Sequence, residues 1–156
     1  MELHDEDVQT YPRPPALEPV QQRVGVVLGG VVIAETVDGL RVLETHHAPT
    51  YYFPPDDVLV SLRQASGGSF CEWKGRATYW DIIGRDRQVA HAAWSYAAPT
   101  KRFAAVRDHL AIYAGLVDEA WVGETRVTPQ PGDFYGGWVT PNLTGIVKGA
   151  PGTRHW

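Results

Sequence analysis

The chain has 156 residues, of which 44% are hydrophobic and 21% are charged, close to the composition of average globular proteins. This length fits one domain with a sizeable core, and it excludes wholesale disorder and collagen-like repetition. The formal charge of −4 argues against general affinity for nucleic acid or anionic membranes.

The first 21 residues are acidic and rich in proline. Four prolines, Pro12, Pro14, Pro15 and Pro19, exclude a regular helix or a central strand there. The opening MELHDEDV is acidic where a signal peptide would be basic, and no apolar run is long enough to span a bilayer. We therefore expect a soluble, cytoplasmic protein in which residues 1–21 form an extended arm and residues 22–156 form one compact domain.

Strand patterns dominate the middle of the chain. Val24–Leu28 and Val31–Ala34 flank Gly29-Gly30, which predicts two β-branched strands around a tight turn. Further strands are predicted at residues 40–43, 51–53, 58–62, 78–83, 88–96, 120–122 and 125–127. Only Phe103–Leu110 has a helical rhythm, with Thr100 as its N-cap. The expected fold is mainly β with one short helix.

The last 28 residues, 129–156, combine six glycines and four prolines with aromatic rings. These rings are Phe134, Tyr135, Trp138 and Trp156. Because burial of aromatic rings drives ordering, we predict that this segment folds back and packs on the body of the domain.

A first group of candidate site residues is Glu44, His46 and His47. An imidazole beside a carboxylate can bind a metal or act as a general base. The spacing matches no metal-binding signature, and adjacent histidines in a strand point to opposite faces, so at most one of them shares a site with Glu44. The structural alternative is one exposed histidine and one hydrogen-bonded beneath a loop.

A second group is Cys71, Lys74 and Arg76. Cys71 is the chain's one cysteine, which excludes an internal disulfide and a multi-cysteine zinc site. A nearby cation would favour its thiolate, although a lone cysteine is also ordinary apolar filler. In an extended segment Lys74 and Arg76 would face the same side, where they would contact a carboxylate or phosphate.

The third group is aromatic and comprises Trp73, Tyr79, Trp80, Trp94, Tyr96, Tyr135 and Trp138. Six tryptophans are many for a chain of this length. Such rings line ligand pockets because one end can stay hydrated, and they also serve as core residues.

Several common catalytic motifs are absent from the sequence. It has no P-loop, no dinucleotide-binding glycine pattern, no nucleophile elbow and no HExxH helix. Asp56 and Asp57, after two prolines, form a pair that would either hold a divalent ion or face solvent.

Several motifs together resemble a bacterial family known as domain of unknown function 427. They are Gly29-Gly30, Arg41–Thr45, His47, Tyr51–Val58, Cys71–Gly75, Ala92–Tyr96, Phe134–Trp138 and Lys148–Thr153. The resemblance covers residues 24–156 and implies two packed antiparallel sheets, tent-like or sandwich-like. The family carries a nucleotidyltransferase tag, and that reaction needs carboxylates to hold Mg²⁺ against the phosphates.

We therefore expect a domain that binds a small molecule, either a nucleotide or an anionic metabolite, and whether it is an enzyme stays open. The expected ligand contacts are Tyr52, Lys74, Arg76, Trp80, Trp94, Tyr135 and Trp138, and the candidate catalytic residues are Glu44, His47, Cys71 and Lys74. No metal ligand or cofactor is assigned. One alternative is Mg²⁺-dependent nucleotidyl transfer by Asp56, Asp57 and Lys74. The other is a non-catalytic interaction module that forms a homodimer through edge strands or the N-terminal arm.

Overall fold

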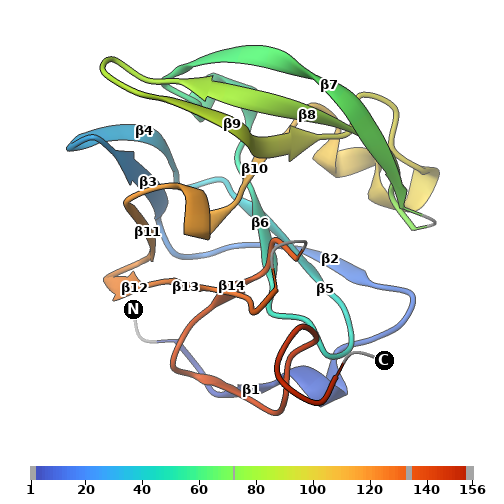
Figure 1. The fold of residues 1–156 in the computed structure, drawn as a ribbon. Coiled ribbons are helices and arrows are strands. Elements are labelled where there is room, and N and C mark those ends of the chain that lie inside the picture. Colours follow the sequence, from blue (N-terminus) through green and yellow to red (C-terminus); the bar gives the residue numbers. More distant parts are fainter. Residues whose placement is uncertain (1–2, 72, 133–134, 154–156) are drawn as a thin grey trace.

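The computed structural model describes residues 3–71, 73–132 and 135–153, and these ranges are almost entirely strands, turns and 3₁₀ helices (Figure 1). The strands are β1 (Glu6–Asp7), β2 (Ala16–Pro19), β3 (Val24–Leu28), β4 (Val31–Thr36), β5 (Leu40–Leu43), β6 (Thr50–Tyr52), β7 (Ser61–Cys71), β8 (Gly75–Ile83), β9 (Gln88–Ser95), β10 (Ala111–Ile112), β11 (Glu119–Val122), β12 (Thr125–Arg126), β13 (Thr128–Pro129), β14 (Trp138–Val139) and β15 (Leu143–Thr144). The 3₁₀ helices are η1 (Val8–Thr10), η2 (Pro55–Asp57), η3 (Lys101–Val106) and η4 (Ala114–Leu116). The predicted mainly β fold is confirmed. Among these residues no helix has the length and apolar character needed to cross a membrane.

Two four-stranded antiparallel sheets form the main layers. One has the order β12-β11-β3-β4 and the other β10-β9-β8-β7, which lies across the top of Figure 1. Alternate residues of β3, Val24, Val26 and Leu28, are buried and pack in one core with Ile82 of β8 and Ile112 of β10. The apolar faces of the two sheets therefore cover each other, as the two-sheet expectation required.

The β3–β4 hairpin forms where the pattern predicted it. Gly29 and Gly30 have φ values of 62° and 74°, the left-handed conformation that both central residues of this tight turn require. The pairing of Val24 with Thr36 and of Leu28 with Val31 sets the register. The Gly29-Gly30 pair therefore predicts this turn from local sequence alone, without knowledge of tertiary contacts.

A short helix forms where one was predicted, but it is a 3₁₀ helix and it ends at Val106, before residue 110. Residues Lys101–Val106 form the 3₁₀ helix η3, in which Phe103 departs from helical geometry at φ −108° and ψ 22°. Phe103 and Val106 are both fully buried, and a spacing of three residues is the repeat of a 3₁₀ helix. Leu110 lies beyond the helix, where its backbone exchanges two 2.8 Å hydrogen bonds with Phe53. Thr100 precedes η3 without a side-chain cap, since its hydroxyl donates to Trp73 O.

The strand predicted at 58–62 begins later and runs further, as β7 over Ser61–Cys71. The register between β7 and β8 shifts between Gln64 and Gly68, and Gly67 there has φ 84°. These glycines therefore form a bulge inside one long strand and do not end it.

The N-terminal stretch pairs with strands of the same chain. β1 lies parallel to β15, and β2 is the edge strand of the β2-β5-β6 sheet, the position that a strand containing proline can occupy. The guanidinium of Arg41 lies 3.1 Å from the Glu6 carboxylate and 2.5 Å from that of Glu18. Val8, fully buried, packs with Tyr11 and Leu43. The expected pairing of subunits through this stretch or through edge strands stays a prediction.

The C-terminal segment returns to the body and winds below β6 in Figure 1. Trp138 is 1% exposed, stacks on Tyr51 with ring centroids 5.1 Å apart, and donates its indole N–H to Ile112 O at 3.0 Å. Of the four predicted packing rings, Tyr135 and Trp138 are described, whereas Phe134 and Trp156 lie outside the described residues.

Candidate functional site

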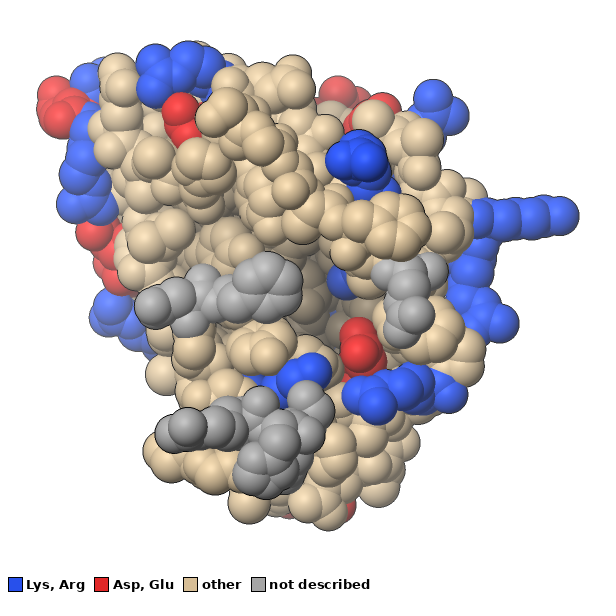
Figure 2. Space-filling model, turned by 45° about the vertical axis from the view of Figure 1, so that its right-hand side comes forward, with Lys and Arg blue, Asp and Glu red and all other residues tan. Residues whose placement is uncertain are grey.

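A cavity of about 450 Å³ brings together residues that are far apart in the sequence. Its walls come from the turn after β5, the β7–β8 turn, the ends of β9 and β10, and the C-terminal segment. Among the predicted site residues, those that line it are Glu44, His47, Cys71, Lys74, Trp94 and Tyr135. Figure 2 shows a hollow on this face with both basic and acidic side chains at its margin.

Two of the three lysines in the chain, Lys74 and Lys148, line this cavity. The Lys74 ammonium lies 5.7 Å from the ring centroid of Tyr96 and donates to the Tyr52 hydroxyl at 3.4 Å. The Lys148 ammonium lies 5.7 Å from the ring centroid of Tyr135. Aromatic faces thus position both cations. Within the described ranges neither lysine has a carboxylate within ion-pair distance, and both lysines line the cavity.

Backbone contacts of the β7–β8 turn set the position of Lys74. Gly75 begins β8 with φ 107°, and Thr100 N donates to Lys74 O at 3.0 Å. The Thr100 hydroxyl donates to Trp73 O at 2.5 Å. The segment before η3 therefore fixes the turn that carries this lysine.

The hydrogen bonds of Gln130 determine which nitrogen of His47 carries the proton. Gln130 is 2% exposed, its Oε1 accepts from Ala48 N at 3.0 Å, and its Nε2 donates to Lys148 O at 2.9 Å. Both partners are backbone groups with fixed roles, so they orient the amide. The same Nε2 lies 3.2 Å from His47 Nδ1 and can only donate, so Nδ1 must accept. Neutral His47 therefore carries its proton on Nε2.

The pKa of His47 is lowered from 6.5 to about 4. Burial is the main cause, followed by repulsion from Lys148, Lys74, Arg13 and His46. The Glu44 carboxylate lies 3.7 Å from Nε2, too far for a strong hydrogen bond that would reverse the shift. His47 is thus a neutral hydrogen-bond donor near pH 7.

Glu44 is the carboxylate on this wall of the cavity. It lies 3.8 Å from the Arg13 guanidinium and 3.7 Å from His47, and its side chain is 22% exposed. In neutral His47, Nδ1 accepts from Gln130 and Nε2 already carries the proton. Of these two side chains, the one with lone pairs that can accept a proton is therefore Glu44.

Aromatic rings form another part of the cavity lining. Trp94 and Tyr113 lie with ring centroids 4.6 Å apart, and the Tyr135 ring meets His47 edge-on at 5.4 Å. Burial, with a further contribution from Tyr79, raises the pKa of Tyr113 to about 12, so its hydroxyl stays a hydrogen-bond donor at neutral pH. The backbone of Gly136 lies against the Trp94 ring, where a Cβ would come within 2.0 Å of Cη2.

Four predicted ligand contacts lie elsewhere. Tyr52 is fully buried and is not a lining residue; it packs with Trp94 and Tyr96, and its hydroxyl accepts from Lys74 at 3.4 Å. Lys74 lies in the turn before β8, so it and Arg76 do not face the same side of one extended strand as expected. Arg76 is exposed on β8. Trp80 lies on the other face of β8 from Tyr79, as neighbours in a strand must, and donates to Ser95 Oγ at 2.8 Å. Trp138 belongs to the core described above.

The acidic pair of the nucleotidyl-transfer alternative does not line the cavity that holds Lys74. Asp56 is exposed in η2, and Asp57 accepts from the Thr36 hydroxyl at 2.7 Å. Within residues 3–71, 73–132 and 135–153, no three His, Cys, Asp or Glu side chains cluster as metal ligands would.

The residues that sequence reasoning did not assign to the site are Lys148, Tyr113 and Gln130. Lys148 had a compositional signal, since the chain contains only three lysines. Tyr113 and Gln130 had none, because their positions depend on pairings between distant segments, such as Tyr113 N with Ala92 O and Gln130 N with Gly137 O.

A comparison with curated proteins finds no match. A family model described as "Domain of unknown function (DUF427)" matches residues 16–123. The match begins with β2 and ends after β11, so it includes the walls carrying Glu44, His47 and Lys74 but stops short of Tyr135 and Lys148. Since it covers more than half of the sequence, the chain belongs to the DUF427 family, as its motifs predicted.

Proposed function

We propose that this chain binds a small organic anion in the cavity between Lys74 and Lys148. The supporting observation is that two lysines lacking a carboxylate partner in the described ranges face one aromatic-walled space. A bound carboxylate or phosphate would supply the opposite charge in a partly dehydrated setting, where charge-assisted hydrogen bonds are strongest.

The neutral state of His47 adds selectivity to this site. His47 lines the cavity and carries its proton on Nε2, 3.7 Å from the Glu44 carboxylate, so this wall offers an additional donor without a third full positive charge. The negative charge of Glu44 disfavours an anion placed against that wall. The ligand's anionic group therefore sits toward the lysines, and the remainder of the ligand contacts Trp94 and Tyr113.

The proposal is tested by titrating inorganic phosphate and AMP into the protein at pH 7.5 while recording tryptophan fluorescence, since Trp73 and Trp94 line the cavity. We expect a saturable change in the wild type. Lys74→Ala should weaken binding roughly tenfold to a hundredfold, the worth of one charge-assisted hydrogen bond.

The matched control is Lys101→Ala, which removes the same charge from the exposed face of η3. The Lys101→Ala variant should bind phosphate and AMP with the affinity of the wild type. Absence of a saturable signal with both compounds, or an equal loss in the two variants, would contradict the proposal.

A further inference from the structure

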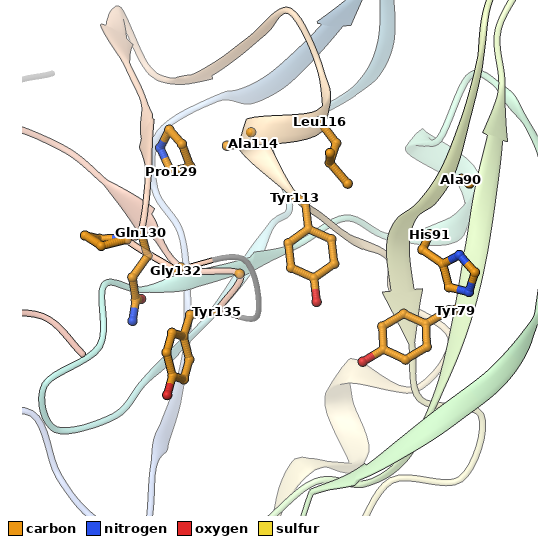
Figure 3. A pocket seen from close by; sticks show the side chains of 14 residues that line it. Tyr79, Ala90, His91, Tyr113, Ala114, Leu116, Pro129, Gln130, Gly132 and Tyr135 are labelled. Atoms are coloured by element: carbon orange, nitrogen blue, oxygen red, sulfur yellow. The ribbon is translucent and has the colours of Figure 1, made fainter. Parts of the chain in front are cut away.

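A second cavity of about 630 Å³ adjoins the one that holds the lysines. The two share Tyr79, Tyr113, Tyr135 and Gly136, so they form two compartments of one cleft. Figure 3 shows the three tyrosines reaching this junction from separate segments.

The two compartments differ in charge. The first contains Glu44, Lys74 and Lys148, whereas among its described lining residues the second has no lysine, arginine or carboxylate. Much of the lining of the second is instead apolar and includes Ala114 and Leu116 of η4 and the rings of Pro129 and Pro131. The Gln130 amide is already committed to Ala48, His47 and Lys148.

An irregularity in β9 lies beside this compartment. The register between β8 and β9 shifts after Trp80, and His91 in the shifted stretch has φ 51°. Asp81 holds the bulge in place, since its Oδ1 accepts from His91 N at 3.0 Å and its Oδ2 lies 3.0 Å from the Arg63 guanidinium. Ala90 and His91 of the bulge are among the residues that line the cavity, and the His91 ring reaches Ser66 O of β7, with Nε2 3.3 Å away.

We infer that the ligand is an anion carrying an aromatic group, with its charge at Lys74 and Lys148 and its ring in the second compartment. This inference rests on the proposed function and names its ligand class. The flat faces of proline and tyrosine suit a planar ring, and the volume lies within the range of small-molecule pockets.

The test compares inorganic phosphate, butyl phosphate and phenyl phosphate by calorimetry on the wild-type protein. Phenyl phosphate should bind roughly tenfold to a hundredfold more tightly than phosphate, because the ring leaves water for an apolar surface. Butyl phosphate should fall between the two. If none of the three binds, the proposed function fails as well. If phosphate binds and phenyl phosphate gains nothing over it, or if butyl phosphate binds as tightly as phenyl phosphate, this inference alone is overturned.

Leu116→Asn locates the ring, with Leu59→Asn as a matched control, since both leucines are exposed but Leu59 is not among the residues lining either compartment. The first variant should lose most of the advantage of phenyl phosphate while keeping wild-type affinity for phosphate, which also shows that it is folded. Leu59→Asn should change neither affinity. Full retention of the phenyl advantage in Leu116→Asn would overturn the assignment of the ring to this compartment.

Discussion

Gln130 and His47 show how a buried amide can set the protonation of a neighbouring imidazole. Because the amide is oriented by two backbone groups, Ala48 N and Lys148 O, it cannot rotate to accept a proton from His47 without losing both bonds. A doubly protonated imidazole would place two donors, Nδ1–H and Gln130 Nε2–H, against each other. Hydrogen bonding and burial thus favour the same neutral state.

This arrangement predicts a specific dependence of stability on pH. The pKa of His47 is about 4 in the folded chain and near 6.5 when unfolded, so between these values the unfolded state binds more protons. The stabilisation is complete above pH 6.5 and is lost as the pH falls toward 4. Between pH 7.5 and pH 5 the free energy of unfolding should fall by about 2 kcal/mol more in the wild type than in His47→Gln, measured by urea denaturation.

The groups surrounding His47, namely Glu44, Lys74, Lys148, Arg13 and His46, are present in both proteins, so the difference between them isolates this one imidazole. Parallel pH profiles for the two proteins would show that His47 titrates normally in the folded state.

The C-terminal segment closes the cavity because two of its glycines allow very close packing. At Gly136 a Cβ would come within 2.0 Å of Trp94, and at Gly149 within 1.9 Å of Pro131 O. Tyr135 and Lys148 are next to these glycines in the sequence, so the same contacts place both site residues.

Gly136→Ala should therefore destabilise the protein by about 1–3 kcal/mol, the usual effect of overpacking, and should also weaken phosphate binding because the Trp94 wall moves. Urea denaturation followed by circular dichroism measures the first effect, and the fluorescence titration measures the second. Gly25→Ala in β3 is the control, because its Cβ would have no neighbour closer than 3.6 Å. Equal stability of the two variants would contradict the close contact at Gly136.

Local patterns and long-range packing explain which elements the sequence could predict. The β3–β4 hairpin and the strands β5, β8 and β9 follow from alternation and turn residues, which are local. The short helix was predicted at the right place but extended too far, to residue 110. A 3₁₀ helix and an α-helix both bury Phe103 and Val106, and the pairing of Leu110 with Phe53 depends on a distant segment. The bulge in β7 depends on the register with β8, which no local pattern contains.

The same distinction holds for the candidate site. The predicted site residues that line one cavity are Glu44, His47, Cys71, Lys74, Trp94 and Tyr135, and their roles there stay predictions. Trp80 was misplaced although strand alternation already puts it opposite Tyr79, so that error was avoidable. Lys148 and Gln130 enter through contacts with segments more than 80 residues away in sequence, as the hydrogen bond between Gln130 and His47 shows, and such contacts are not visible in a single sequence.

Across the whole molecule, the cavity depends on both ends of the chain. Arg13 from the N-terminal stretch lies beside Glu44, while Tyr135 and Lys148 come from the C-terminal segment. A second buried cluster, which includes Tyr52, Phe103 and Val106, packs with the wall residues Trp94 and Tyr96. The small β2-β5-β6 sheet carries the turn with His47. An anion bound between these segments should therefore raise the free energy of unfolding of the whole domain.

Alkylation of Cys71 tests anion binding in this cavity most directly. Cys71 is the chain's one cysteine and lines the cavity beside Lys74, so neutral iodoacetamide reports on this space alone. Phosphate should slow alkylation, as measured by intact-protein mass spectrometry. The phosphate concentration that halves the alkylation rate should equal the one that half-saturates the fluorescence change. Lys74→Ala should raise both of these concentrations. An alkylation rate that stays constant while phosphate saturates the fluorescence signal would place the bound anion outside this cavity.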